Sequence, residues 1–187
     1  MKKVNHQIDQ KIPSWEVEYL FVGTFNPKGG KHVPYYYGRE KNQFWKLLSS
    51  IFDSTFEVDK TDFFEQIIKH KIACIDIIDS IEKSNGTMFS EIELENICGK
   101  GYSDSVILSN KYKRNYSTEL INKIISENKN IKVYSTWGKG KSLKNWNIEL
   151  SKIKFNANLV SPSLAARIPK GMKKFDFMIS DWKSKIK

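Results

Sequence analysis

Amides, hydroxyls and aromatic rings gather directly after an apolar run near the start of the chain. The stretch FVGTFNPKGGKHVPYYYGREKNQFW (21–45) carries Asn26, Tyr37 and Asn42, and a later polar stretch contains Ser161. Such groups suit a planar, neutral heterocycle, because an aromatic ring stacks on it while amides bond its edge. A glycosidic bond to such a base breaks through an oxocarbenium-like state, which requires a positioned water and donors for the departing base. The residue types therefore indicate a base-like ligand, with hydrolysis of its glycosidic bond as the candidate chemistry.

Other common enzyme chemistries lack their sequence patterns. The chain has no GxxxxGK[ST] phosphate loop, GxGxxG fingerprint or GxSxG elbow. The histidines His6, His32 and His70 do not cluster with Cys or carboxylates at ligand spacing, which argues against a protein-bound zinc. Cys74 and Cys98 also lack metal-ligand spacing and are expected to be structural thiols in a reducing cytoplasm. We therefore expect neither a metal nor another cofactor.

Length and charge narrow the class of protein. The chain has 187 residues, of which 40% are hydrophobic, so we expect a single domain over residues 1–187. The formal net charge of +10 attracts polyanions such as DNA, although the abundance of Lys, Asn and Ile could reflect a coding bias. The N-terminus, MKKVNHQIDQ, has no apolar stretch typical of a secretory signal, and no run approaches a membrane span. A cytoplasmic protein is therefore expected.

The elements that must position these groups alternate along the chain. We expect strands at 17–23, 71–78, 105–110, 130–138 and 155–163, and helices from near Lys41, at 59–70, at 117–128 and at 175–186. Strands that alternate with helices predict an α/β fold. We expect a three-layer α/β/α architecture with a central, mainly parallel sheet of four to five strands.

Hydrophobic spacing predicts which faces of the first two helices are buried. In the first helix, Phe44 and Trp45 are expected in the core rather than against a ligand. In the second helix, Phe64, Ile67 and Ile68 should form the buried stripe.

Ligands of such folds bind where the strands end at their carboxyl side. Asp76 and Asp79 could therefore enter a pocket, or they could cap the segment that follows. The segments that follow expected strands are GTFNP (23–27), DIIDS (76–80), TWGKG (136–140) and SPSLAAR (161–167).

The order of these segments resembles the uracil-DNA glycosylase superfamily. The resemblance lies in FVGTFNP, then YYYGREKNQFWKLL, then KIACIDIIDSIEKSNGTMFSEI, then LVSPSLAAR, and it covers about residues 18–167. The second and third segments look most like the hypoxanthine-DNA glycosylase branch. The Asn-Pro after the first strand looks more like the mismatch-specific uracil/thymine branch. The resemblance implies the uracil-DNA glycosylase-like fold and base excision, without naming the base.

The resemblance also implies roles for residues in the first two segments. Asn26 matches the residue that positions the attacking water, although its spacing from Gly23 is one residue longer than usual. Asn42 matches the important Asn of the Asn-x-Phe-Trp segment, and Tyr37 matches the ring that stacks on the flipped base. The remaining base-binding candidates of these segments are Gly23, Thr24 and Phe25.

The last segment matches a loop that enters the DNA minor groove. Leu164 would be the wedge, and Arg167 and Ser163 would contact DNA. Ser161 stands where relatives often carry His or Asn to bond the base, and a hydroxyl stabilises a leaving oxyanion less well. Lys139, in the preceding TWGKG segment, is a further candidate DNA contact.

Together these features predict a metal-free, monofunctional DNA glycosylase that is a monomer. Its target would be a deaminated or modified base flipped out of DNA, such as hypoxanthine, uracil or a modified pyrimidine of the kind found in phage DNA. No lysine nucleophile is matched, so we do not expect a lyase activity. Two alternatives stay open: a non-catalytic nucleic-acid-binding protein that keeps the fold, and a hydrolase of small-molecule N-glycosides.

Overall fold

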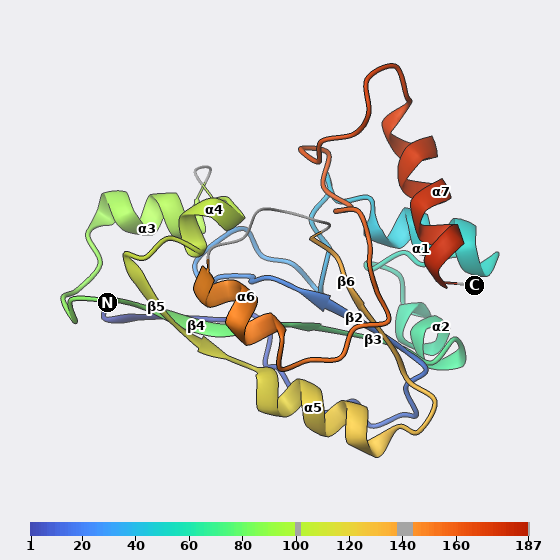
Figure 1. Ribbon diagram of the computed structural model, residues 1–187, viewed down its shortest axis with the longest axis horizontal. Coiled ribbons are helices and arrows are strands. Elements are labelled where there is room, and N and C mark those ends of the chain that lie inside the picture. The colour runs from blue at the N-terminus through green and yellow to red at the C-terminus, as the bar shows by residue number, and fades with distance from the viewer. Residues whose placement is uncertain (100–101, 138–143, 187) are drawn as a thin grey trace.

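The computed structural model describes residues 1–99, 102–137 and 144–186, and it has a mixed α/β fold. Figure 1 shows the strands crossing the middle of the molecule with helices around them. No described helix is long and apolar enough to cross a membrane.

A four-stranded parallel sheet forms the centre. Its strands lie in the order β3 (Ile72–Asp76), β2 (Tyr19–Gly23), β6 (Lys132–Ser135) and β7 (Ala157–Asn158). Every residue of β3 and all but the first of β2 are buried, as expected for strands covered on both faces. The carboxyl ends of the strands therefore share one edge of the sheet.

A second, antiparallel sheet was not predicted. It has the order β1 (Lys3–Asn5), β4 (Ile78–Lys83) and β5 (Tyr112–Tyr116), and β4 follows β3 after a single residue. The strand expected at 105–110 is wrong, because this segment contains the short helix α4 (Asp104–Ile107) and a turn before β5 begins. The apolar run here has three residues, which is too short for its periodicity to distinguish a helix from a strand, and the helix that forms buries Ile107.

Helices cover both faces of the parallel sheet. The helices expected at 117–128 and 175–186 are observed at 118–127 and 174–186, and the helix expected from near Lys41 begins at Phe44. The helices contribute apolar side chains to one of two clusters. On one face, Phe21 and Tyr134 of the sheet pack with α1 (Phe44–Phe52), α2 (Phe63–Lys69) and α7 (Lys174–Ile186). On the other face, Leu20 and Val133 pack with the antiparallel sheet and with α3 (Glu91–Cys98), α4 and α5 (Thr118–Glu127), while α6 (Lys144–Leu150) joins through Leu150.

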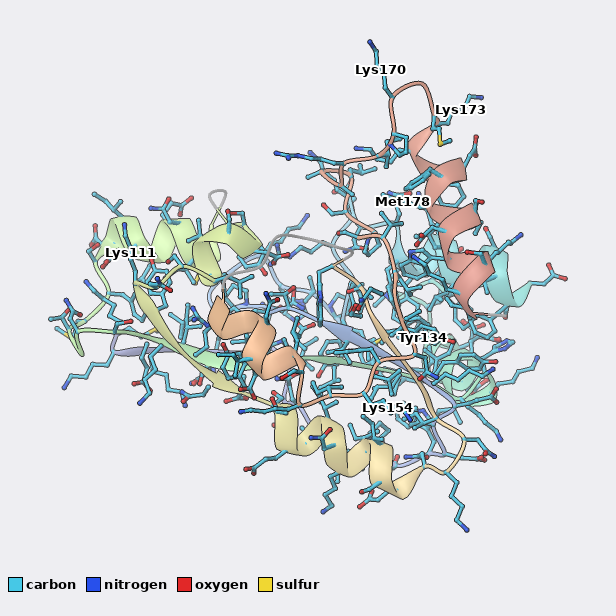
Figure 2. The ribbon with its side chains drawn as sticks, viewed as in Figure 1. Lys111, Tyr134, Lys154, Lys170, Lys173 and Met178 are labelled. Atoms are coloured by element: carbon cyan, nitrogen blue, oxygen red, sulfur yellow. The ribbon has the colours of Figure 1, made fainter. Side chains whose placement is uncertain are left out.

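Figure 1 shows this division, with α1, α2 and α7 grouped at the right, α3, α4 and α6 toward the left and α5 along the bottom. Tyr134 on β6 and Met178 on α7, both buried, are labelled in Figure 2. The arrangement is compatible with a three-layer α/β/α fold.

The buried face of α2 differs from the prediction. Phe63 and Ile67 are buried, whereas Phe64 is 50% exposed and Ile68 is 43% exposed. Two apolar pairs at i and i+4 compete in this seven-residue helix, so the spacing does not decide which pair is buried. Phe44 and Trp45 of α1 are buried, as predicted.

Candidate functional site

A cavity of about 490 Å³ opens at the carboxyl edge of the parallel sheet. Each strand of the sheet leads into it, because Thr24, Asp76, Thr136 and Ser161 all line it and all lie at or after a strand end. This volume is within the range of small-ligand sites. The four strand ends expected to form a site therefore do converge.

The floor of the cavity is packed tightly around Gly23. A Cβ atom at this position would lie 2.1 Å from Asp76 Oδ1 and 2.7 Å from the Tyr37 hydroxyl oxygen. Gly23 and Asp76 are register partners at the ends of β2 and β3. The absence of a side chain at Gly23 therefore lets a carboxylate and a phenol approach each other above the end of the sheet.

A buried hydrogen-bond network surrounds Asp76. Its Oδ2 atom accepts from Asn26 Nδ2 at 2.8 Å and lies 2.8 Å from His6 Nε2. The Asp76 backbone N–H donates to Gln10 Oε1 at 2.7 Å. The His6 and Asp76 side chains are only 2% and 3% exposed. Two segments thus hold the carboxylate, through His6 and Asn26, while its Oδ1 atom lies toward Gly23 and Tyr37.

The N-terminal segment also holds the loop that carries Asn26. His6 forms an antiparallel bridge with Pro27, Gln7 N donates to the Asn26 carbonyl at 2.7 Å, and Lys28 N donates to the Asn5 carbonyl at 2.8 Å. This pairing continues from β1 and fixes the backbone on both sides of Asn26. Because its amide nitrogen bonds Asp76, Asn26 keeps its Oδ1 atom as an acceptor at the cavity wall.

Tyr37 lines the cavity with its ring against a core residue. Its ring stacks on Phe44, with ring centroids 3.8 Å apart, and its hydroxyl lies 3.0 Å from Thr136 Oγ1. The backbone is left-handed, with φ of 58°. Burial and, secondly, the charge of Asp76 raise the pKa of the Tyr37 hydroxyl well above its ordinary value, so it stays protonated. A ligand can stack only on the ring face that Phe44 leaves free.

Asn42 lies two residues before α1 and lines the cavity. Its Oδ1 atom accepts from Phe44 N at 2.9 Å, which satisfies one free N–H of the first turn of α1. Asn42 also forms an antiparallel bridge with Ser163, and Gln43 N donates to the Pro162 carbonyl at 2.9 Å. The loop after β7 is therefore attached directly to the start of α1, and Asn42 Nδ2 remains available at the cavity.

The cavity is also lined by residues that the sequence patterns did not indicate. Tyr102 donates from its hydroxyl to the Phe25 carbonyl at 2.5 Å, and the Arg39 guanidinium lies 4.5 Å above the Tyr102 ring. Within the described residues, the buried Arg39 Nε has no hydrogen-bond partner. The Asp104 residue is exposed overall, but its carboxyl faces Tyr102 and Thr24, and desolvation and, secondly, Asp76 raise its pKa.

The outer rim is formed by the segment after β7. Ser163, Ala165 and Ala166 line the cavity, whereas Leu164 is 46% exposed and Arg167 is exposed. The Leu164 carbonyl accepts from Lys174 Nζ at the start of α7. This segment therefore presents an apolar and a basic side chain to solvent beside the cavity.

Some of the lysines expected near the site are described by the structure and others are not. In Figure 2, Lys170 and Lys173 lie at the far tip of the loop before α7 and project away from the body of the protein. Lys139 and Lys141 lie outside the described residues.

Most of the predicted site residues come together. Gly23 lies beneath the cavity, Leu164 and Arg167 lie at its rim, and the following residues line it: Thr24, Phe25, Asn26, Tyr37, Asn42, Ser161 and Ser163. Of the two strand-end acids, Asp76 enters the site and Asp79 is exposed on β4. His6 was missed because nothing in the local sequence pairs it with an acid 70 positions away.

The fold and the site together define a mixed α/β protein with a cavity of mixed polar and apolar lining at the carboxyl edge of a parallel sheet. Comparisons with protein-family models, with curated proteins and with solved structures found no match to this chain.

Proposed function

We propose that this protein is a monofunctional DNA glycosylase with a uracil-DNA glycosylase-like, three-layer α/β/α fold. It would hydrolyse the N-glycosidic bond of a deaminated or modified base that has been flipped out of DNA. Hypoxanthine, uracil and modified pyrimidines are the candidate bases.

The observation that carries the proposal is the convergence of remote segments on one cavity. Asn26, Asn42 and Ser161 lie far apart in the sequence and line the same cavity together with Tyr37. A flipped base needs a ring to stack on and polar groups at its edge. The amides, hydroxyls and the Tyr37 ring that line this cavity support both requirements.

The rim supports DNA, rather than a free nucleoside, as the substrate. A partly exposed Leu164 follows the cavity-lining Ser163 directly, and the exposed Arg167 lies three positions further along. An apolar side chain can fill the gap left by an extruded base, and a guanidinium can contact a backbone phosphate. A small-molecule hydrolase needs neither group, and the net charge of +10 also favours a polyanion.

The test is a screen for base release. End-labelled duplexes with a single uracil, hypoxanthine, xanthine or 5-hydroxymethylcytosine are incubated with the protein, and abasic sites are then cleaved with alkali. Scission at the modified position, with free base recovered from solution and an unmodified duplex left intact, is the expected result. Binding without scission on every duplex would contradict the proposal and indicate a non-catalytic reader. Release of base from free nucleosides, with intact DNA left untouched, would indicate a small-molecule hydrolase.

A further inference from the structure

The proposed reaction requires a group that accepts a proton from water. Asn26 and Asn42 can orient a water molecule, but a carboxamide does not take up a proton at neutral pH. Among the described residues, the cavity is lined by two carboxylic acids, Asp76 and Asp104. The two acids differ in the hydrogen-bond partners of their carboxyl oxygens, and this difference indicates different roles.

Asp76 has one oxygen engaged and one directed toward the floor of the cavity. Its Oδ2 atom is held by His6 Nε2 and Asn26 Nδ2, each at 2.8 Å. Its Oδ1 atom is the nearest neighbour of the Cβ position of Gly23, next to the Tyr37 hydroxyl. Two bonds to the same oxygen fix the orientation of the carboxylate and leave the other oxygen to meet a water molecule.

His6 is placed so that it donates to Asp76 whether its ring is neutral or charged. An ionised Asp76 carboxylate can only accept, so in the neutral ring the proton toward it is on Nε2, and Nδ1 then accepts from the Ile8 N–H at 3.0 Å. The Ile8 carbonyl lies 2.8 Å from the same Nδ1 and can accept from it in the charged ring. In both states Nε2–H points at Asp76 Oδ2, which makes His6 a constant support for the carboxylate.

Asp104 is less suited to act as the base. Its Oδ1 atom lies 3.5 Å from the Tyr102 hydroxyl, which already donates to the Phe25 carbonyl. Because the pKa of Asp104 is raised by desolvation and by Asp76, it holds its proton to higher pH than an ordinary Asp. Asp104 therefore faces Tyr102 and Thr24, whereas the Asp76 carboxylate is fixed by donors from His6 and Asn26.

We propose that Asp76 is the general base of this site and that His6, supplied by the N-terminal segment, is its positioning residue. The inference rests on the proposed glycosylase function. Asp76 Oδ1 takes one proton from the attacking water, whose oxygen forms the bond to C1′ of the sugar. The C1′–N bond breaks with its electron pair going to the base nitrogen, and the proton on Asp76 passes to the departing base or to solvent. The charge of Asp76 also stabilises the positive charge that develops on the sugar.

The decisive variant is Asp76→Asn, which keeps the shape and removes the base. We expect the single-turnover rate of base release to fall about 1,000-fold. Affinity for a duplex with a non-hydrolysable 2′-fluoro analogue of the released nucleotide should be unchanged or tighter. The matched control, Asp79→Asn, removes an exposed carboxylate three positions along the same segment and should keep the wild-type rate. An active Asp76→Asn protein would overturn the inference, and one that keeps its rate but changes its preferred base would show that Asp76 reads the base.

A second pair of variants tests His6 without touching the carboxylate. His6→Gln can retain an N–H donor toward Asp76, and His6→Leu cannot, so we expect losses of about tenfold and about 100-fold respectively. In His6→Leu, but not in His6→Gln, the acid limb of the pH–rate profile should move to higher pH, because only the leucine variant takes a donor away from the carboxylate. A wild-type rate and a wild-type pH–rate profile in both variants would overturn the role of His6. If Asp76→Asn does not fold, the two His6 variants still test whether the Asp76 carboxylate controls the rate. Failure of the proposed function looks different, because the wild-type protein would then release no base.

Discussion

The floor and the rim of the cavity differ in how firmly their side chains are held. On the floor, Asp76, His6 and Tyr37 are tied to one another or to the sheet by hydrogen bonds and ring stacking. At the rim, Leu164 and Arg167 are exposed, and among the described residues no hydrogen bond or ion pair fixes either side chain. The same cavity thus combines a rigid part with a part that is free to adjust.

This difference separates two tasks. Bond cleavage requires reacting groups that are already in place, because misplacement by about 1 Å can cost about 100-fold in rate. Contact with a long, deformable polyanion requires side chains that can follow its backbone. We therefore expect changes on the floor to act on the rate of base release, and changes at the rim to act on DNA binding.

Of the substitutions that test the difference between floor and rim, Gly23→Ala is expected to lower the rate of base release most. In Gly23→Ala, the new Cβ atom would overlap Asp76 Oδ1 at 2.1 Å and the Tyr37 hydroxyl at 2.7 Å, so both groups must move. We expect base release to fall about 1,000-fold and stability to fall by about 1–3 kcal/mol, as for other overpacked sites. Single-turnover kinetics and thermal unfolding measure the two effects.

Gly86→Ala is the matched control for this loss of stability. Gly86 has a φ of +72° and nothing within 4 Å of a built Cβ atom, so the substitution strains the backbone away from the cavity. It should lower the melting temperature while base release stays near wild type. Equal loss of activity in both variants would show that stability, and not the floor geometry, controls the rate.

The next largest effect is expected for Asn26→Ala and Asn42→Ala. Each removes an amide from the cavity wall, and we expect base release to fall about 100-fold with DNA affinity little changed. Asn42→Ser separates catalysis from helix capping, because a Ser side chain can still accept from the first turn of α1. It should restore the melting temperature but not the rate. Gel-shift titration and single-turnover assays that show equal losses of rate and affinity would contradict these assignments.

The residues that line the cavity differ in whether the sequence alone could place them at the site. Asn26, Asn42 and Tyr37 were expected at the site because their segments resemble those of the uracil-DNA glycosylase superfamily, and all three line the cavity. The strand before them is recognisable from its apolar run, and parallel strands bring their carboxyl ends to one edge. His6 and Arg39 could not be placed at the site, because their places depend on pairing between segments that are remote in the chain. Long-range antiparallel pairing leaves little local signal when the strand has three residues, as β1 does.

For the helices too, the sequence predicts some features and not others. The positions of α1, α5 and α7 follow from the spacing of apolar residues, since each helix is long enough to give a clear face. The choice between Phe63 and Phe64 as the buried residue of α2 depends on what packs against it. A seven-residue helix with two adjacent apolar pairs does not contain that information.

At the rim, Leu164→Ala should have a smaller effect that depends on DNA structure. The side chain is 46% exposed and would become buried only when it fills the gap left by a flipped base. We expect a loss of about 1 kcal/mol, or roughly fivefold in base release, on fully paired duplexes. On single strands the loss should vanish, because there is no gap to fill. Ile92→Ala on α3, which truncates an exposed apolar residue elsewhere, is the control, and a uniform loss on both substrates would argue against a wedge.

Arg167→Ala should have the smallest effect and should act on binding alone. An exposed guanidinium that contacts one phosphate releases about one counterion, so the slope of log affinity against log salt should become shallower by about 1. Affinity near physiological salt should fall by about threefold, and the single-turnover rate at saturating protein should not change. Lys111→Ala is the matched control, because Figure 2 places Lys111 at the end of the molecule away from the loop before α7. If both variants change the salt slope equally, DNA is attracted by the overall charge and the rim has no defined contact. If Arg167→Ala lowers the rate and leaves the slope unchanged, Arg167 acts with the floor, and the division between the two regions is wrong at this residue.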